Sequence, residues 1–120
     1  MNLIEIILAL FSVLCLVANQ VLVKMWLLNR SISVWPINKH FFYSLFSWEI
    51  GSAGVVIVIS SLIWVYLLER IEFSLLYPII SLSYVFGLLA GKFIFGEQIP
   101  ATRWVGVIII IIGVLIVNKN

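Results

Sequence analysis

Residues 74–95 read SLLYPIISLSYVFGLLAGKFIF, and Lys92 is the only charged side chain among them. A helix needs about 20 mainly apolar residues to cross the hydrocarbon core of a bilayer, so this stretch predicts a transmembrane helix. The first of the other apolar runs exceeds the roughly 7–15 residues of a signal-peptide core, so we expect it to stay in the membrane. These other runs lie at about 3–24, 44–68 and 101–117. We therefore expect an all-α integral membrane protein with four transmembrane helices and short loops, forming a single transmembrane domain over residues 1–120.

The composition agrees with this fold class and excludes several kinds of chemistry. Of the 120 residues, 64% are hydrophobic and 10% are charged, whereas soluble domains average about 45–50% apolar and 25% charged residues. Cys15 and His40 are the only cysteine and the only histidine, which leaves no basis for a disulfide framework, a metal site or Ser-His-Asp chemistry. We expect a protein that is not an enzyme and that uses no cofactor, no metal and no nucleic acid.

The links between the apolar runs suggest how the helices are arranged. Residues 69–72, ERIE, form a short charged link, which predicts that the second and third helices are antiparallel neighbours. The longer link 27–42 is expected at the membrane interface, with Trp26 and Trp35 in the aromatic belt. In residues 96–100, GEQIP, the glycine suits the end of the third helix and the proline suits the start of the fourth.

The distribution of Lys and Arg bears on the orientation in the membrane. Five of these side chains fall beside the first and third links, and two fall on the opposite side. By the positive-inside rule this favours both termini outside. If Lys24 and Lys92 are counted as intramembrane, the ratio becomes three to two.

The third apolar run carries a stripe of polar side chains. At about 100° per residue, Tyr77, Ser81, Tyr84 and Lys92 fall within a sector roughly 80° wide, which suits a hydrated path through the membrane. Pro78 removes a backbone donor within this stripe and predicts an interruption of the helix. Alternatively, the two tyrosines anchor the helix at the interface and the lysine extends to the membrane surface.

Polar groups also occur in the first and second runs. Asn19, Gln20 and Lys24 close the first run, where they could bind an anionic or polyhydroxylated headgroup, with the lysine as counter-charge. Alternatively, the amides bond to neighbouring helices. Glu49 lies about one turn inside the second run, either as a proton or cation site or as an interfacial carboxylate paired with Lys39 or with His40.

Glycines mark two faces for close helix packing. Gly106 and Gly113 lie seven residues apart, hence on one face of the fourth helix, and are expected to pack a dimer. Gly87 and Gly91 have the GxxxG spacing. The sequence leaves open whether this second pair packs within one subunit or between two.

Several stretches resemble one group of membrane transporters. The chain is similar to the drug/metabolite transporter superfamily, with a small multidrug resistance-like layout. It most resembles the small subunits of the aminoarabinose-phosphoundecaprenol flippase. The matching stretches are ANQVLVK at 18–24, LYPIISLSYVF at 76–86, GK at 91–92, FGEQ at 95–98 and WVGV at 104–107. The likeness covers the first helix and nearly everything after about residue 64.

This resemblance implies four-helix subunits that work as homo- or heterodimers. The first three helices would line the path and the fourth would hold the subunits together. The implied activity is movement of an undecaprenyl-phosphate-linked sugar across the bacterial inner membrane. Lys24 or Lys92 would then meet the phosphate, and polar side chains of the first and third helices would meet the sugar. Those side chains are Asn19, Gln20, Tyr77, Ser81 and Tyr84.

One departure separates the chain from the related multidrug exporters. Those proteins carry a glutamate in the middle of the first helix, where this chain has Leu16. Without that carboxylate, proton-for-cation exchange has no group at this place, which favours the lipid-linked sugar. Two alternatives stay open: a cation/proton exporter that uses Glu49 instead, and a non-transporting accessory subunit of a larger membrane enzyme.

Overall fold

The computed structural model describes residues 2–29 and 39–119, and within these ranges every regular element is a helix. The expected all-α membrane fold is confirmed. Three segments are long and apolar enough to cross a membrane, Leu3–Asn29, Trp48–Arg70 and Phe73–Phe93, and Ala101–Val117 is an apolar but shorter helix. In chain order the elements are α1 (Leu3–Asn29), α2 (Lys39–Ser44), α3 (Trp48–Arg70), α4 (Phe73–Leu76), the 3₁₀ helix η1 (Tyr77–Leu82), α5 (Ser83–Phe93) and α6 (Ala101–Val117). The expected place of Trp35 falls outside the described residues.

The helix α1 begins at the expected residue, Leu3, but ends later than expected. At its start, the Asn2 side chain accepts a hydrogen bond from the Glu5 N–H (2.9 Å), and the Glu5 carboxylate accepts one from the Asn2 N–H (3.1 Å). This reciprocal pair satisfies two backbone donors that a helix start leaves open. At its other end the helix continues to Asn29 instead of stopping at 24, since the apolar residues that follow Lys24 contain no helix breaker.

The second apolar run begins its long helix at Trp48, not at 44 as the sequence predicts. Ser47 has an extended backbone and its hydroxyl accepts a hydrogen bond from the Ile50 N–H at 3.5 Å, which makes it the N-cap. The preceding residues form the short helix α2, held by Trp26, whose indole N–H donates to the Ser44 carbonyl at 2.8 Å. Trp26 is 4% exposed, so its ring packs against protein, and its place in the aromatic belt stays a prediction.

The third apolar run is interrupted as Pro78 predicts. The chain forms α4, then the 3₁₀ helix η1 with the proline in its first turn, and only then α5. The Ser81 hydroxyl donates to the Pro78 carbonyl, which supplies a partner for a backbone group near the break. After α5, Gly96 adopts a φ of 67°. This left-handed conformation is readily adopted by glycine. The helix itself ends earlier, at Phe93 with Ile94 as its C-cap, so Gly96 turns the chain just beyond the helix end.

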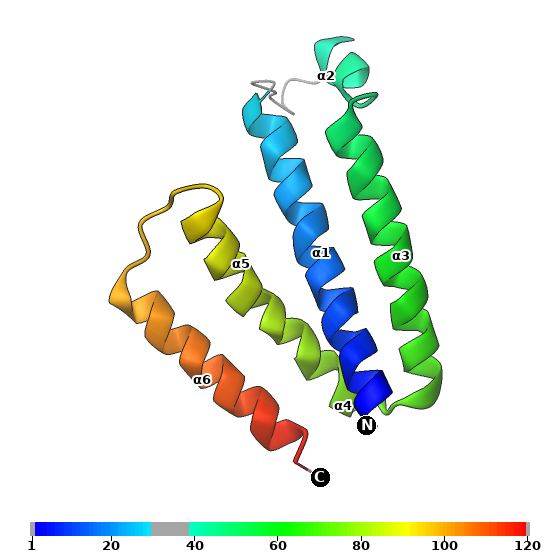
Figure 1. Cartoon of the computed structure of the whole chain (residues 1–120), viewed down its shortest axis with the longest axis vertical. Helices are drawn as coiled ribbons and strands as arrows, with labels where there is room; N and C mark the ends of the chain where they lie inside the picture. Colours follow the sequence, from blue (N-terminus) through cyan, green and yellow to red (C-terminus); the bar gives the residue numbers. More distant parts are fainter. Residues whose placement is uncertain (1, 30–38, 120) are drawn as a thin grey trace.

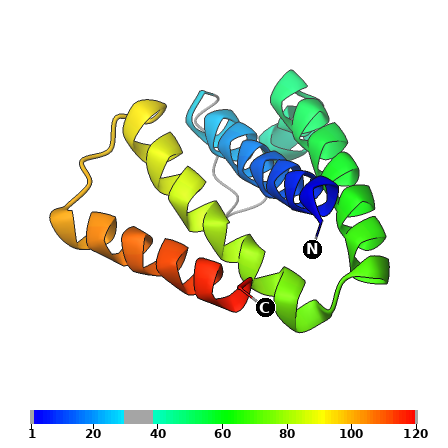
Figure 2. The same cartoon turned by 60° about the horizontal axis from the view of Figure 1, so that its bottom comes forward.

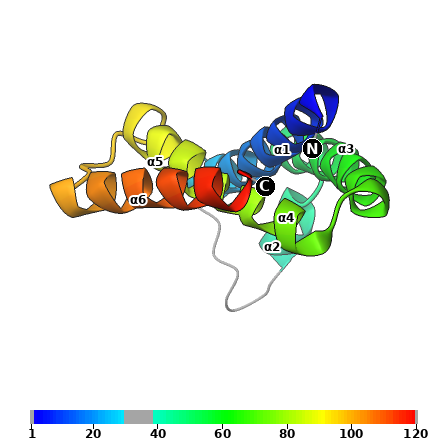
Figure 3. The same ribbon diagram turned by 90° about the horizontal axis from the view of Figure 1, so that it is seen from below.

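The helices form a thin slab with α1 in its middle, and the slab measures 52 × 37 × 22 Å. In Figure 1, α3 lies on one side of α1 and α5 on the other, and α6 lies outermost beyond α5. Both termini are at the same end of the slab. Figures 2 and 3 show α5 and α6 extending together away from the α1–α3 pair. The link 69–72 reverses the chain as expected, but α5 then packs against α1 and not against α3.

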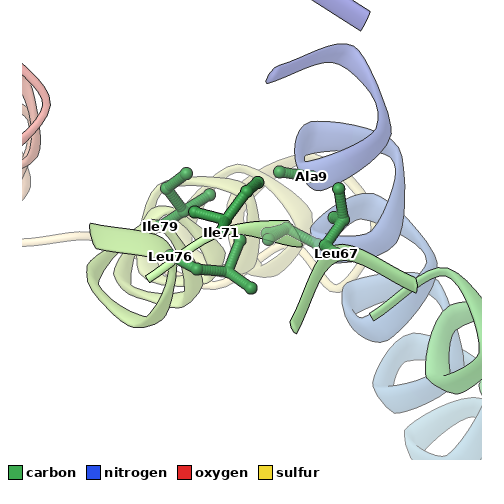
Figure 4. Close-up of a cluster of buried hydrophobic side chains, with 6 residues drawn as sticks. Ala9, Leu67, Ile71, Leu76 and Ile79 are labelled. Atoms are coloured by element: carbon green, nitrogen blue, oxygen red, sulfur yellow. The ribbon is translucent and has the colours of Figure 1, made fainter. Parts of the chain in front are cut away.

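One small apolar cluster joins the elements at the end that carries the termini. It lies where the N-terminal half of α1 meets the end of α3 and the α4–η1 segment (Figure 4). Its members are Ala9, Val13, Leu67, Ile71, Leu76 and Ile79. Outside this cluster many large apolar side chains are exposed, including Leu62 and Ile116 at 67% each. Such surfaces suit acyl chains as their solvent.

Candidate functional site

The polar side chains of α1 point to two different neighbours. The Asn19 amide is 8% exposed and donates to the Ala53 carbonyl of α3 at 2.7 Å. Gln20, the next residue, is about 100° further round the helix and faces α5 instead. A single bond joins the two, from the Gln20 amide to the Asn19 side-chain oxygen at 3.3 Å. Only Gln20 therefore lies on an open surface, while Asn19 connects two helices.

The α1–α3 interface satisfies its other buried polar groups internally. The Ser12 hydroxyl donates to the Ser60 carbonyl at 3.1 Å, and the Ser60 hydroxyl donates to the Ser12 carbonyl at 3.0 Å. Their exposed fractions are 2% and 6%. Reciprocal bonds between small polar residues are a common way to hold helices together in lipid. This serine pair therefore has a structural role, and a hollow of about 380 Å³ lies beside it between α1, α3 and η1.

The interface between α1 and α5 contains a cleft of about 360 Å³. On the α5 side its floor is made of Ser83, Gly87 and Gly91, which are four residues apart and so share one helix face. The absence of large side chains at these positions keeps the two helices from filling the space between them. The full lining is Leu16, Val17, Gln20, Val21, Lys24, Ser83, Gly87, Ala90, Gly91, Phe95 and Glu97.

A pair of opposite charges lies at one end of this cleft. The Lys24 Nζ is 3.5 Å from the Glu97 Oε2, and the two side chains are 47% and 45% exposed. The same ammonium lies 4.9 Å from the centre of the Phe95 ring. A half-exposed ion pair of this length contributes about 0–1 kcal/mol. Either group can therefore exchange its partner at low cost.

The chain holds Glu97 in this place through two glycines. Gly96, at its φ of 67°, turns the backbone so that the Glu97 N–H donates to the Gly91 carbonyl at 2.9 Å. The Glu97 carboxylate then lies against α5 at Gly91, where an added Cβ would collide with its Oε1. The two glycines therefore direct the carboxylate into the mouth of the cleft.

The stripe expected on the third helix does not form one face of the cleft. Residues 77–82 are a 3₁₀ helix, so an angle of 100° per residue does not apply across them. Tyr77 is 53% exposed and stacks on Phe73 at 4.9 Å. Ser81 bonds to the Pro78 carbonyl.

The remaining two members of the stripe lie outside the cleft as well. Tyr84 is 65% exposed and lines a separate hollow of about 360 Å³ between α5 and α6. The Lys92 ammonium lies 5.1 Å from the Trp104 ring centre, on the α6 side. Of the seven predicted substrate-binding residues, the structure thus brings Gln20 and Lys24 together in the cleft. A substrate contact for the other five stays a prediction.

Glu49 is buried, at 2% exposure, in the first turn of α3. A helix N-terminus favours a negative side chain, which gives the carboxylate a local reason for its position. It lines none of the four cavities described among residues 2–29 and 39–119. Its role as a proton or cation site stays a prediction.

The glycines of α6 face open space. A Cβ added at Gly106 or at Gly113 would meet no atom within 4 Å. The helix also exposes large apolar side chains, such as Ile109 at 63% and Leu115 at 66%. This surface is available to a second subunit, and dimer packing through it stays a prediction.

Of the residues that line the cleft, only Gln20 and Lys24 were predicted as site residues; those that were missed include Ser83, Gly87 and Glu97. The spacing of Ser83 with Gly87 and Gly91 is a sequence signal, because three small residues four apart define one open helix face. No comparable signal exists for the ion pair, since Lys24 and Glu97 are 73 residues apart in the chain.

The chain is similar to several curated proteins of one kind. A probable 4-amino-4-deoxy-L-arabinose-phosphoundecaprenol flippase subunit of Photorhabdus laumondii is 27% identical over 110 residues, 92% of this chain and 96% of the relative. The protein of the same description in Aeromonas salmonicida is 40% identical over 75 residues, 62% of this chain and 65% of the relative. The one in Enterobacter sp. (strain 638) is 35% identical over 64 residues, 53% and 60% of the respective lengths.

The likeness to the small subunits of this flippase, drawn above from short stretches of sequence, is confirmed by these relatives. One relative is matched over nearly its whole length, and the other two over about three fifths. No family model matches the chain, and no solved structure matches it.

Proposed function

We propose that the chain is a flippase-type subunit that moves an amino sugar, linked through phosphate to undecaprenol, across the bacterial inner membrane. The observation that carries the proposal is the cleft between α1 and α5, which holds an exchangeable cation, Lys24, at its mouth. The named substrate of the similar proteins supports the same cargo. It is a lipid whose headgroup carries a phosphate and a sugar.

The depth of Lys24 suits a lipid phosphate. At about 1.5 Å per residue, the 27 residues of α1 span about 40 Å, which exceeds a hydrocarbon core of about 30 Å. Lys24 lies within the last turns of this helix and therefore near the boundary between acyl chains and headgroups. A lipid phosphate lies at this level, so its oxygens can replace the Glu97 carboxylate at the ammonium.

The rest of the cleft suits a sugar attached to a long apolar tail. Gly87 and Gly91 leave room beside α1, while Gln20 and Ser83 offer an amide and a hydroxyl for hydrogen bonds. The tail stays in the bilayer, against the exposed apolar surfaces of the slab. Net transport then requires a headgroup affinity that differs between the two faces of the membrane, or removal of the product on one face.

A second subunit completes the path in this proposal. The slab is only 22 Å thick, about two helix diameters, so one chain cannot surround a sugar phosphate. The α6 face with Gly106 and Gly113 is the surface we assign to a partner, either another copy or a similar small four-helix subunit.

The test is translocation of a lipid-linked amino sugar into proteoliposomes, with the chain reconstituted together with its co-purifying subunit. We expect Lys24→Ala to slow translocation at least tenfold, because the phosphate loses its counter-charge. Lys39→Ala, which removes an exposed cation from α2 at the same end of the slab, is the matched control and should leave the rate unchanged. Equal rates for the wild type and Lys24→Ala would overturn the proposal. Lys92→Ala should slow translocation less than Lys24→Ala.

The same assay separates the alternatives. A proton-coupled exporter that depends on Glu49 should lose export of quaternary ammonium compounds in Glu49→Gln, and should not move the lipid-linked sugar. An accessory subunit should add nothing to translocation by its partner. The relatives named above support the flippase role, so it is the one we adopt.

A further inference from the structure

The mouth of the cleft presents both signs of charge, and the proposed function so far uses only one. Lys24 supplies the cation for phosphate. Glu97 lines the same cleft, is 45% exposed, and is directed there by Gly91 and Gly96. A carboxylate at this position would repel an isolated lipid phosphate. Its placement makes chemical sense when the headgroup also carries a positive charge.

We infer that Glu97 determines specificity. When the substrate binds, the Glu97 carboxylate leaves Lys24 and binds the ammonium group of the amino sugar, while Lys24 binds the phosphate. The inference rests on the proposed function. In the empty cleft the two side chains neutralise one another. In the occupied cleft each binds the opposite charge of a zwitterionic headgroup, so the number of ion pairs rises from one to two.

The structure offers three features that suit this exchange. The Lys24–Glu97 contact is long, at 3.5 Å, and both side chains are about half exposed, so little is lost when they separate. The two groups come from different elements, α1 and the α5–α6 connection, and can move apart. In a 4-amino sugar linked through its first carbon, the amine and the phosphate lie on opposite sides of the ring, so they require two separated charges.

Phe95 adds to the same end of the site. Its ring faces the Lys24 ammonium at 4.9 Å, and an aromatic face attracts any cation placed over it. When Lys24 turns to the phosphate, the substrate ammonium can take the position between Phe95 and Glu97. A neutral sugar gains nothing from either group, and a carboxylate-bearing sugar is repelled.

The experiment compares two lipids that differ only in the charge of the sugar. One is polyprenyl-phosphoryl 4-amino-4-deoxyarabinose, and the other is its N-acetyl derivative, which keeps the phosphate and the tail. Binding of each is measured to the chain in lipid nanodiscs, with its co-purifying subunit present. We expect the wild type to bind the lipid with the free amine about tenfold more tightly than the N-acetyl lipid. One charge-assisted hydrogen bond is strong enough to give a difference of this size.

Two substitutions test the roles of the two charged side chains separately. Glu97→Gln should bring the affinity ratio close to one while affinity for the N-acetyl lipid is retained, whereas Lys24→Gln should weaken both lipids. Glu69→Gln, at an exposed acid on α3, should keep the wild-type ratio. Gly91→Ala keeps the carboxylate but displaces it from the cleft, so it should also reduce the ratio and serves if Glu97→Gln does not fold.

The outcomes distinguish this inference from the function beneath it. If Glu97→Gln or Gly91→Ala keeps the preference for the amine, Glu97 is not the specificity residue, although the flippase role stands. If the wild type binds both lipids equally, the inference about Glu97 also fails, and the flippase role again stands. If the wild type binds neither lipid, the proposed function fails, and the inference that rests on it fails as well.

Discussion

Polar side chains on the two faces of α1 differ in whether they have partners on the neighbouring helix. Toward α3, the Ser12–Ser60 and Asn19–Ala53 contacts are buried, and each polar group has a partner on the other helix. Toward α5, Gln20 lies beside a cleft, and Lys24 has one long contact to a carboxylate. One helix therefore carries an interface whose polar groups pair with one another and an interface whose polar groups stay available, although a hollow of about 380 Å³ also lies beside Ser12 and Ser60.

The contrast shows that a polar residue in a membrane span does not by itself indicate a transport path. Polar groups in hydrocarbon need hydrogen-bond partners. Packed helices can supply these partners without forming a path for a substrate. Unfilled space lies on both sides of α1, so what marks the α5 side is a pair of charges that are easily exchanged. The variants below test whether this difference between the two faces is real.

The largest effect is expected from overfilling the closely packed part of the α1–α3 interface, around Ala53. Ala53 is 3% exposed and its carbonyl already accepts the Asn19 amide, so Ala53→Leu should lower the free energy of unfolding by about 1–3 kcal/mol. Thermal unfolding in detergent, followed by helical circular dichroism, would measure it. A stability equal to that of the wild type would show that the α1–α3 face is not close-packed.

Filling the open face should instead affect function. A Cβ at Gly87 meets no atom within 4 Å, so Gly87→Leu should fold normally. Gly87 lines both the cleft and the hollow between α5 and α6, so a leucine there should reduce the space beside α5 and slow translocation about tenfold, equivalent to about 1.4 kcal/mol. Gly54→Leu is the matched control, since Gly54 is exposed on α3 and equally unobstructed. Equal slowing by both variants would show that the space beside Gly87 has no special role in translocation.

Two neighbouring amides give a finer comparison. Asn19→Ala removes a buried bond between helices and should cost about 1 kcal/mol of stability. Gln20→Ala removes an exposed amide from the cleft and should change stability by less than about 0.5 kcal/mol. Both values come from the same unfolding measurement. A larger loss for Gln20→Ala would reverse the assignment of the two side chains.

The smallest effect on stability is expected at Gly91. An added Cβ there collides only with the end of the Glu97 side chain, which can swing away, so Gly91→Ala should cost less than about 0.5 kcal/mol. The Lys24–Glu97 coupling, about 0.5 kcal/mol by a double-mutant cycle, should nevertheless disappear. Gly51→Ala, at an open position, should retain the coupling. Unchanged coupling in Gly91→Ala would mean that Glu97 is not held by this glycine.

Much of the fold follows from local sequence, because apolar length and helix breakers act within a few residues. The run 101–117 is a helix over the expected residues, and Pro78 and Gly96 interrupt the chain where they should. The helix start at Trp48 was missed by four residues, since its N-cap, Ser47, sits inside an otherwise apolar stretch.

The site was less accessible to sequence reasoning because it depends on how each helix is rotated. Asn19 and Gln20 are adjacent in the chain, yet they face different helices, and nothing local decides which one faces α3. The stripe from Tyr77 to Lys92 assumed an unbroken helix, and the 3₁₀ turn removes that assumption. Glu97 was missed because its importance comes from Lys24, a partner brought near only by tertiary packing.

The difference between the two faces can be measured with single cysteines in a Cys15→Ser background. Ser83→Cys, in the cleft, should react in native membranes with a small charged thiol reagent, and added lipid-linked 4-amino-4-deoxyarabinose phosphate should protect it. Ala53→Cys, which is 3% exposed between α1 and α3 and does not line the hollow beside Ser12 and Ser60, should remain unlabelled with or without the lipid. Equal labelling at both positions, or labelling of Ser83→Cys that the lipid does not reduce, would show that the headgroup does not enter between α1 and α5.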